Sequence, residues 1–181
     1  MHYKDVVKLL ETAFIKLGYQ QGRDKNWFVQ SPETTIVVKF FIDTHEKEFT
    51  VDLGILFNKL TATCSWKKIR LQRTHFGDEL AFILYAMGEP DTYLKKLFSY
   101  DAAINSDTDI IDNISDLSEL YQTKIVPYLE QFNDYAFLAE NFEDELYRKQ
   151  LNLYYPAKMS HFKEFFELQF NLQLQQQLIS H

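Results

Sequence analysis

The stretch at residues 106–120 holds the side chains whose types and spacing are most suggestive of chemistry. It reads SDTDIIDNISDLSEL and contains five acids and no base. An EF-hand calcium loop needs oxygen ligands at its first, third and fifth positions, Gly at the sixth and Glu at the twelfth. A loop that starts at Asp107 has Ile111 fifth and Ser118 twelfth, and one that starts at Asp109 ends on Leu120. Neither register fits, and no Gly is present, so the pattern argues against calcium.

The same stretch has the spacing of an amphipathic helix over about 107–132. With each residue rotated by about 100° around the axis, one side collects the apolar residues Ile110, Ile114, Leu117, Tyr121, Ile125, Tyr128 and Phe132. The opposite side collects Asp109, Asp112, Asp116 and Glu119, which we call the acidic stripe. Ser106 and Asp109 have capping-box spacing. Pro127 predicts a kink or break near Val126.

An acidic stripe without interleaved lysines is costly, because like charges one helical turn apart repel each other. Three interpretations stay open: a solvated face, a surface that pairs with basic residues of the same chain, and a surface that binds a basic protein partner. Under the last interpretation, the four acids of the stripe are the partner-binding residues. Between residues 100 and 145 the chain has 12 acids and one base, whereas the rest has 14 acids and 18 bases.

A basic cluster lies earlier in the chain, on the predicted strand 65–73. It consists of Lys67, Lys68, Arg70 and Arg73 beside Trp66. A sheet face with basic and aromatic side chains is typical of single-strand nucleic-acid binding. The solvent face of a sheet, or a charged edge strand, has the same composition. The net charge of −7 favours this second interpretation, and we expect no nucleic-acid partner.

No other motif points to catalysis, a metal or a cofactor. The five histidines are scattered without metal-ligand spacing, and Cys64 is the only cysteine. No glycine-rich phosphate loop and no nucleophile elbow is present. We therefore name no catalytic residue, expect no metal or cofactor, and favour a protein that is not an enzyme.

The elements that must position these residues indicate a single α+β domain over 1–181. Residues 1–76 predict a helix at 3–17, ended by Gly18, and a four-stranded antiparallel meander with strands at 26–30, 35–43, 48–55 and 65–73. Residues 77–181 are predicted to be mainly helical and to pack on one face of the sheet. Helices are expected from Asp78 to about Met87 (a buried one), at 107–132, at 134–142 and at 157–178, although 170–175 also alternates as a strand would. Residues 91–101 are ambiguous.

Cysteine usage and hydropathy bear on the location of the protein. A single cysteine allows no disulfide within the chain. The N-terminus lacks the continuous apolar region of a signal peptide, and no apolar run approaches the roughly 20 residues that span a bilayer. We expect a cytoplasmic protein without a membrane partner.

Four phrases together carry a family resemblance: KLGYQQGRDKNWFV, EFTVDLGI, CSWKKIRLQR and DLSELYQTKIVPYLEQFND. They resemble a family of small bacterial domains of unknown function, over about residues 1–143. The matching positions are 53–55, 69–71 and 125–127 with Phe132, whereas 65–68 depart from the pattern and the last 38 residues lie outside it. The resemblance implies an α+β fold and no enzyme activity. Such acidic domains are also similar in style to the immunity proteins of toxin systems.

Three hypotheses about function remain. The first is a bacterial protein-interaction domain, such as an immunity protein that binds a basic toxin domain through the acidic stripe. The second is a small-ligand sensor or an enzyme with an aromatic pocket between sheet and helices. The third is a subunit of a homo-oligomer that uses exposed apolar residues of the last helix, namely Phe162, Phe165, Phe166 and Leu172.

Overall fold

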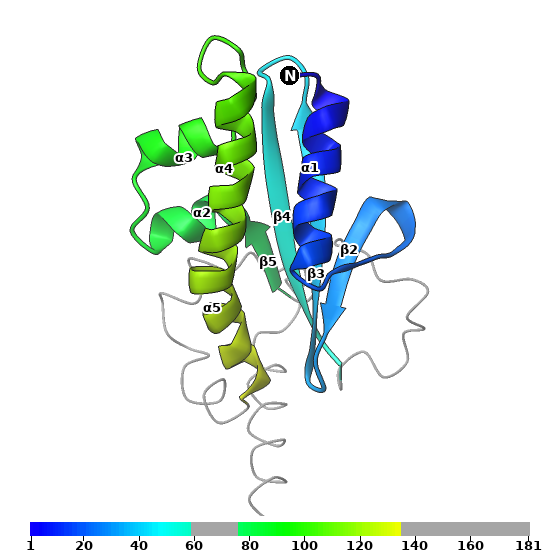
Figure 1. The fold of residues 1–181 in the computed structure, drawn as a ribbon. Coiled ribbons are helices and arrows are strands. Elements are labelled where there is room, and N and C mark those ends of the chain that lie inside the picture. The colour runs from blue at the N-terminus through cyan, green and yellow to red at the C-terminus, as the bar shows by residue number, and fades with distance from the viewer. Residues whose placement is uncertain (59–75, 135–181) are drawn as a thin grey trace, which may run out of the picture.

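The structure, a computed structural model, describes residues 1–58 and 76–134. A five-stranded sheet carries helices α1 and α4 side by side on one face, and α2 and α3 lie beside them (Figure 1). The strand order is β1-β2-β3-β4-β5, and every neighbouring pair is antiparallel. The predicted α+β class, with an N-terminal helix, a meander and later helices, is confirmed.

The central strands are those that the alternation of apolar residues predicts. They are β2 (Asn26–Gln30), β3 (Thr34–Asp43) and β4 (Glu48–Phe57). The predicted count of four strands is wrong for the described residues, because β1 (Gln20–Gln21) and β5 (Phe76–Glu79) bring it to five. Both additions are too short to show a period of two. The predicted strand 65–73 lies outside the described residues.

The face of the sheet toward α1 and α4 forms the core. Ile36, Val38, Val51, Leu53 and Ile55 are buried in one cluster with the apolar sides of the helices. These residues alternate along β3 and β4 and share one face, since a strand points alternate side chains to opposite faces.

On the opposite face of the sheet, polar and apolar residues separate along the strands. Val37 and Leu56 form a small buried cluster there, against which Phe28 packs. Lys39 of β3 lies opposite Asp52 of β4. Asp52 in turn lies opposite Glu79 of β5, so one row of this face is charged.

Helix α1 (Tyr3–Lys16) packs on the sheet through Val6, Leu10 and Phe14, which recur every four residues. As predicted, Gly18 follows the end of the helix, and its φ of 88° is a left-handed conformation that favours glycine. The backbone N–H groups of Gly18 and Tyr19 donate to carbonyl groups of the last turn.

Helix α2 (Leu80–Ala86) begins two residues later than predicted, because Asp78 and Glu79 belong to β5. It is only half buried, contrary to the prediction of a buried helix: Leu80, Ile83 and Leu84 face the core, whereas Phe82 and Tyr85 are 62% and 60% exposed. The turn after α2 contains Gly88, with a φ of 96°. The ambiguous segment forms helix α3 (Asp91–Leu97).

Helix α4 (Asp107–Leu120) continues through a π turn (Tyr121–Ile125) into α5 (Val126–Glu130) and a short 3-10 turn (Gln131–Asn133). These segments form one rod (Figure 1). Pro127 lacks an N–H, and its ring would clash with the carbonyl group four residues earlier in a regular α-helix. The wider π turn lies directly before it. The predicted interruption is therefore present as a π turn and not as a break.

The apolar side of the rod is buried as predicted. The predicted residues from Ile110 to Ile125 and Phe132 are at most 4% exposed. Beyond the π turn, Leu129 is the more deeply buried residue, while Tyr128 is half-buried, because a π turn inserts one residue and rotates the next helical turn about the axis.

Within residues 1–58 and 76–134, every helix falls short of the length and apolar character needed to cross a membrane.

Candidate functional site

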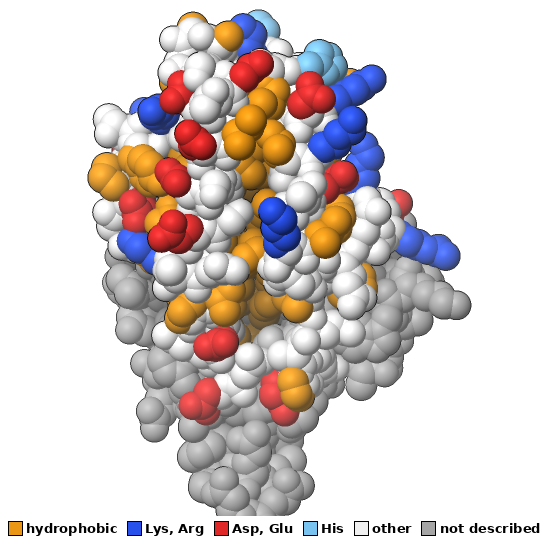
Figure 2. All heavy atoms as spheres, viewed as in Figure 1, with side chains coloured by type: hydrophobic (Ala, Val, Ile, Leu, Met, Phe, Trp, Pro, Cys, Tyr) orange, Lys and Arg blue, Asp and Glu red, His pale blue; other side chains and the backbone are white. Residues whose placement is uncertain are grey.

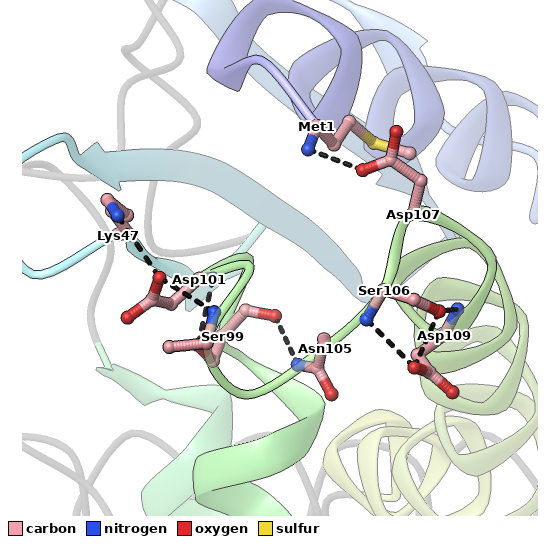
Figure 3. Close-up of polar contacts among 9 residues, drawn as sticks. Met1, Lys47, Ser99, Asp101, Asn105, Ser106, Asp107 and Asp109 are labelled. Atoms are coloured by element: carbon pink, nitrogen blue, oxygen red, sulfur yellow. Dashed lines mark hydrogen bonds and ion pairs between the residues drawn. The ribbon is translucent and has the colours of Figure 1, made fainter.

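The acidic stripe begins with a residue that has a structural task. The Asp109 carboxylate accepts hydrogen bonds from the Ser106 backbone N–H at 2.8 Å and the Ser106 hydroxyl at 2.6 Å. The Asp109 N–H donates to the Ser106 hydroxyl oxygen at 3.2 Å, which completes the predicted capping box (Figure 3). Hydrogen bonds from Ser106 hold the pKa of Asp109 below its usual value. Asp109 is thus committed to starting α4.

Two acids near the stripe are also engaged within the chain. The Asp107 carboxylate forms an ion pair with the amino group of Met1, which joins the starts of α1 and α4 (Figure 3). Asp101 accepts a hydrogen bond from the Ala103 N–H and pairs with Lys47 at 3.1 Å, and these contacts hold its pKa below the usual value. A partner that bound either acid would therefore have to displace a contact within the chain.

The remaining acids of the stripe, Asp112, Asp116 and Glu119, are exposed. Among the described residues, no cation forms an ion pair with any of the three. Burial raises the pKa of Tyr93 on α3, and the nearby carboxylates of Asp116, Glu89 and Glu119 raise it further. Acidic side chains accordingly gather over α3 and α4 on the face that Figure 2 shows.

A second feature is a pocket at the side of the sheet, which we call the aromatic pocket. It has a volume of about 560 Å³ and lies between the start of β4, helix α2 and helix α3. Its lining includes four aromatic and three acidic residues: Phe49, Phe82, Tyr85, Phe98, Glu48, Glu79 and Asp91. Lys95 also lines it and pairs with Asp91 at 2.8 Å.

The position of the aromatic pocket follows from the edge of β4. Strand β5 pairs with residues 52–55 of β4. At the other end of β4, Phe49 donates its N–H to the Phe98 carbonyl oxygen at 2.9 Å. The backbones of Glu48 and Ser99 form an isolated antiparallel β-bridge there. The pocket lies between these two attachments, where α2 and α3 turn back over the strand.

The carboxylates around the aromatic pocket are crowded. Burial raises the pKa of Glu79, and the neighbouring carboxylates of Asp52, Asp78 and Glu48 raise it further. Burial likewise raises the pKa values of Asp52 and Asp78. Negative charge that is concentrated in a site partly shielded from solvent attracts a cation.

A third feature is the groove between α1 and α4, visible as a line of hydrophobic side chains in Figure 2. It is smaller, at about 360 Å³, and its apolar lining comes from Leu9, Ala13, Leu17, Ile111 and Ile114. It contains no acid and one base, Lys16, so it offers packing and little chemistry.

Several predicted sites lie outside the described residues. The basic cluster of Lys67, Lys68, Arg70 and Arg73 is among them, as are Cys64 and the apolar residues of the predicted last helix. In residues 1–58 and 76–134, no group of His, Cys, Asp and Glu side chains is arranged to hold a metal ion.

One hypothesis from the sequence included an aromatic pocket between sheet and helices, but it placed none of the lining residues. The run from Leu80 to Met87 is so apolar that it predicted a buried helix, which placed Phe82 and Tyr85 in the core. The sequence does contain a signal for the exposed side of this helix. Two large aromatics three residues apart share one helix face. Leu80, Ile83 and Leu84 already supply the buried face, so the aromatic face is left for solvent.

The comparison with protein families matches residues 10–131 to the domain of unknown function DUF4304. This match covers about two thirds of the chain. The chain belongs to the DUF4304 family. The resemblance to a family of domains of unknown function is thereby confirmed, with narrower bounds than the expected 1–143, whereas the likeness to immunity proteins stays a prediction. No curated protein and no solved structure matches the chain. The DUF4304 region contains the whole sheet, the aromatic pocket and the acidic stripe, so both surfaces lie in the family's domain and not in an appended segment.

Proposed function

We propose that this DUF4304 domain is a protein-interaction module that binds a basic protein through α4. The observation that carries the proposal is the exposed triplet Asp112, Asp116 and Glu119, for which the described residues provide no ion-pair partner. A one-sided negative surface speeds encounter with a positive partner and makes the binding sensitive to salt. The repulsion within the stripe is then relieved in the complex.

The partner class that fits this surface is a basic toxin domain, which makes the protein a bacterial, cytoplasmic immunity protein. Such a protein has to bind its toxin quickly and needs no catalysis of its own. Electrostatic steering supplies the speed, because it raises association rates well above those of neutral surfaces.

The test begins with cross-linking and affinity capture from the native cells, followed by purification of the captured protein and measurement of its affinity. The triple variant Asp112→Lys, Glu119→Lys and Asp116→Lys is expected to lose binding by at least about a hundredfold. Asp109 is left unchanged because it caps α4.

The matched control is Asp5→Lys, Glu11→Lys and Glu46→Lys, which makes the same change in net charge on α1 and in the turn between β3 and β4 and leaves α4 itself unaltered. This control is expected to keep most of the affinity. Equal affinity of the parent protein and the α4 variant for the captured protein would contradict the proposal, as would an acidic captured partner.

A second candidate function is favoured by the aromatic pocket. Its volume of about 560 Å³ falls in the range of small-molecule sites, and it combines aromatic walls with converging polar groups. A small-ligand sensor is thus the alternative. Thermal-shift screening of the purified chain against metabolites distinguishes the two functions, because a sensor gains stability from its ligand without any protein partner.

A further inference from the structure

The aromatic pocket combines two recognition elements that independently suit a planar cation. Phe82 and Tyr85 present aromatic rings at its surface, and both are more than half exposed. Glu48 and Glu79 add carboxylates, and within the described residues neither forms an ion pair. A guanidinium group stacks on aromatic rings and forms paired hydrogen bonds with a carboxylate, so the two elements act on the same group.

The charge balance of the pocket leaves room for one further cation. Its lining contains three acids and one base, and Lys95 is already paired with Asp91 at 2.8 Å. Asp52 and Asp78 lie close enough to Glu79 to raise its pKa. The site therefore carries an excess of negative charge that an incoming cation would offset.

The same side of the sheet already contains a contact between a cation and an aromatic ring. The amino group of Lys39 lies over the ring of Phe41, 4.8 Å from its centre. Lys39 is also the residue opposite Asp52 across β3 and β4. A cation that stacks on an aromatic ring and partly offsets the burial-raised pKa of a neighbouring carboxyl group is thus already present one strand away from the pocket.

The openness of the pocket favours a side chain from a protein over a free small molecule. Small-molecule sites bury most of their ligand, whereas the two aromatic rings at this rim are 62% and 60% exposed. Exposed aromatic rings beside carboxylates are typical of the anchor points of protein interfaces, where arginine is also enriched.

We propose that the aromatic pocket binds an arginine side chain of a protein partner, with its guanidinium stacked on Phe82 or Tyr85 and hydrogen-bonded to Glu79. This inference rests on the proposed function for the basic partner, but it places a contact on a different surface. Helix α3 separates the pocket from the acidic stripe: Asp91 and Lys95 line the pocket, whereas Tyr93 lies near Asp116 and Glu119.

The experiment titrates the full chain with a short peptide, acetyl-Gly-Ser-Arg-Ser-Gly-amide, and follows backbone amide shifts by NMR. Parallel titrations use the same peptide with citrulline in place of arginine, and free arginine amide. We expect shifts around α2 and the start of β4 with the arginine peptide, and at least about tenfold weaker binding of the uncharged citrulline peptide.

Variants of the pocket identify the contacts. Phe82→Ser and Tyr85→Ser are expected to weaken binding of the arginine peptide by about fivefold or more, and Glu79→Gln by a similar factor. Phe41→Ser is the matched control, because it removes an exposed ring that does not line the pocket. Circular dichroism checks that each variant is folded. We expect folded variants, because the substituted rings are exposed.

Three results would overturn the inference. They are equal binding of the arginine and citrulline peptides, binding that survives all three pocket variants, and binding of free arginine amide as tight as that of the peptide, which would make this a small-molecule site. The α4 triple variant separates the two proposals. Peptide binding that is lost in that variant and kept in the pocket variants would leave the stripe as the interaction surface and refute the pocket.

Discussion

At the scale of single residues, a buried polar contact joins the hydroxyl groups of Tyr19 and Tyr121. Tyr121 is 1% exposed and Tyr19 is 5% exposed, and both rings pack edge-on against Phe14. Burial raises the pKa of both tyrosines, so both stay protonated at neutral pH. One hydroxyl group donates a hydrogen bond to the other in a site with little exposure to solvent.

Tyr19→Phe should therefore lower the free energy of unfolding by about 1–3 kcal/mol, because it leaves the Tyr121 hydroxyl buried without its partner. The double variant with Tyr121→Phe should recover part of that loss. Urea denaturation of the two single variants and the double variant measures the coupling. Strictly additive losses would show that the pair contributes nothing beyond two separate rings.

Glu79 is a residue at which stability and binding oppose each other. Its raised pKa means that the folded state disfavours the charged form. The resulting cost is absent below the unfolded pKa, near 4.5, and is complete once the pH exceeds the raised folded pKa. Glu79→Gln should then be more stable than the parent at pH 7 by roughly 0.5 kcal/mol, since water screens this half-exposed group.

The same comparison at about pH 4 should show a smaller difference, because the carboxyl group is then largely protonated in both states. Thermal unfolding of the parent and the variant at the two pH values measures the change. A variant that is less stable than the parent at pH 7 would show that Glu79 has a favourable partner in the folded state.

At the scale of elements, the capping box at Ser106 fixes the start of α4 and with it the phase of the whole rod. Ser106→Ala removes the hydroxyl group that accepts from the Asp109 N–H, and should lower the free energy of unfolding by about 1 kcal/mol. Ser106→Asp should restore most of the loss, because aspartate also caps helices well. Denaturant titration of both variants gives the values, and an unchanged midpoint for Ser106→Ala would contradict the assigned role.

The elements differ in how far the sequence predicts them. Strands β3 and β4 and helices α1 and α4 bury one regular face each, so the spacing of Val51, Leu53 and Ile55 or of Ile110, Ile114 and Leu117 suffices. Strands β1 and β5 depend on pairing with a neighbour that is distant in the sequence, and four residues or fewer carry no period. Helix α2 is apolar on nearly all sides, so its solvent side is marked only by the aromatic pair Phe82 and Tyr85 opposite the smaller Leu80, Ile83 and Leu84.

The two parts of the candidate site also differ in how far the sequence predicts them. The acids of the stripe were predictable because a helix turns their spacing into a common side. The aromatic pocket combines Glu48 and Thr50 with Glu79, Phe82 and Asp91, and these residues meet only because β4 and β5 are paired. Such a meeting depends on tertiary structure and leaves no local signal.

At the scale of the whole molecule, repulsion among the charges that give the net charge of −7 lowers the stability of the folded state. Salt screens this repulsion, with a Debye length of about 10 Å at 0.1 M. The melting temperature should therefore rise between about 20 mM and 500 mM sodium chloride. The α4 triple variant, whose net charge is −1 because three acids become three bases, should show a smaller rise. Differential scanning calorimetry measures both, and equal rises would show that the stripe is too well solvated to matter.

The two outer strands of the sheet have a consequence for solubility. Strand β1 has two residues and β5 has four, whereas β3 and β4 have ten each. A second molecule that adds a strand to a sheet needs a long row of open backbone groups, and short outer strands deny it one. On the β5 side, the contacts of Phe49 with Phe98 and of Tyr100 with Lys47 also cover the beginning of β4. Among residues 1–58 and 76–134, the meander thus keeps its long strands inside the sheet, and this part of the protein offers copies of itself little backbone through which to polymerise.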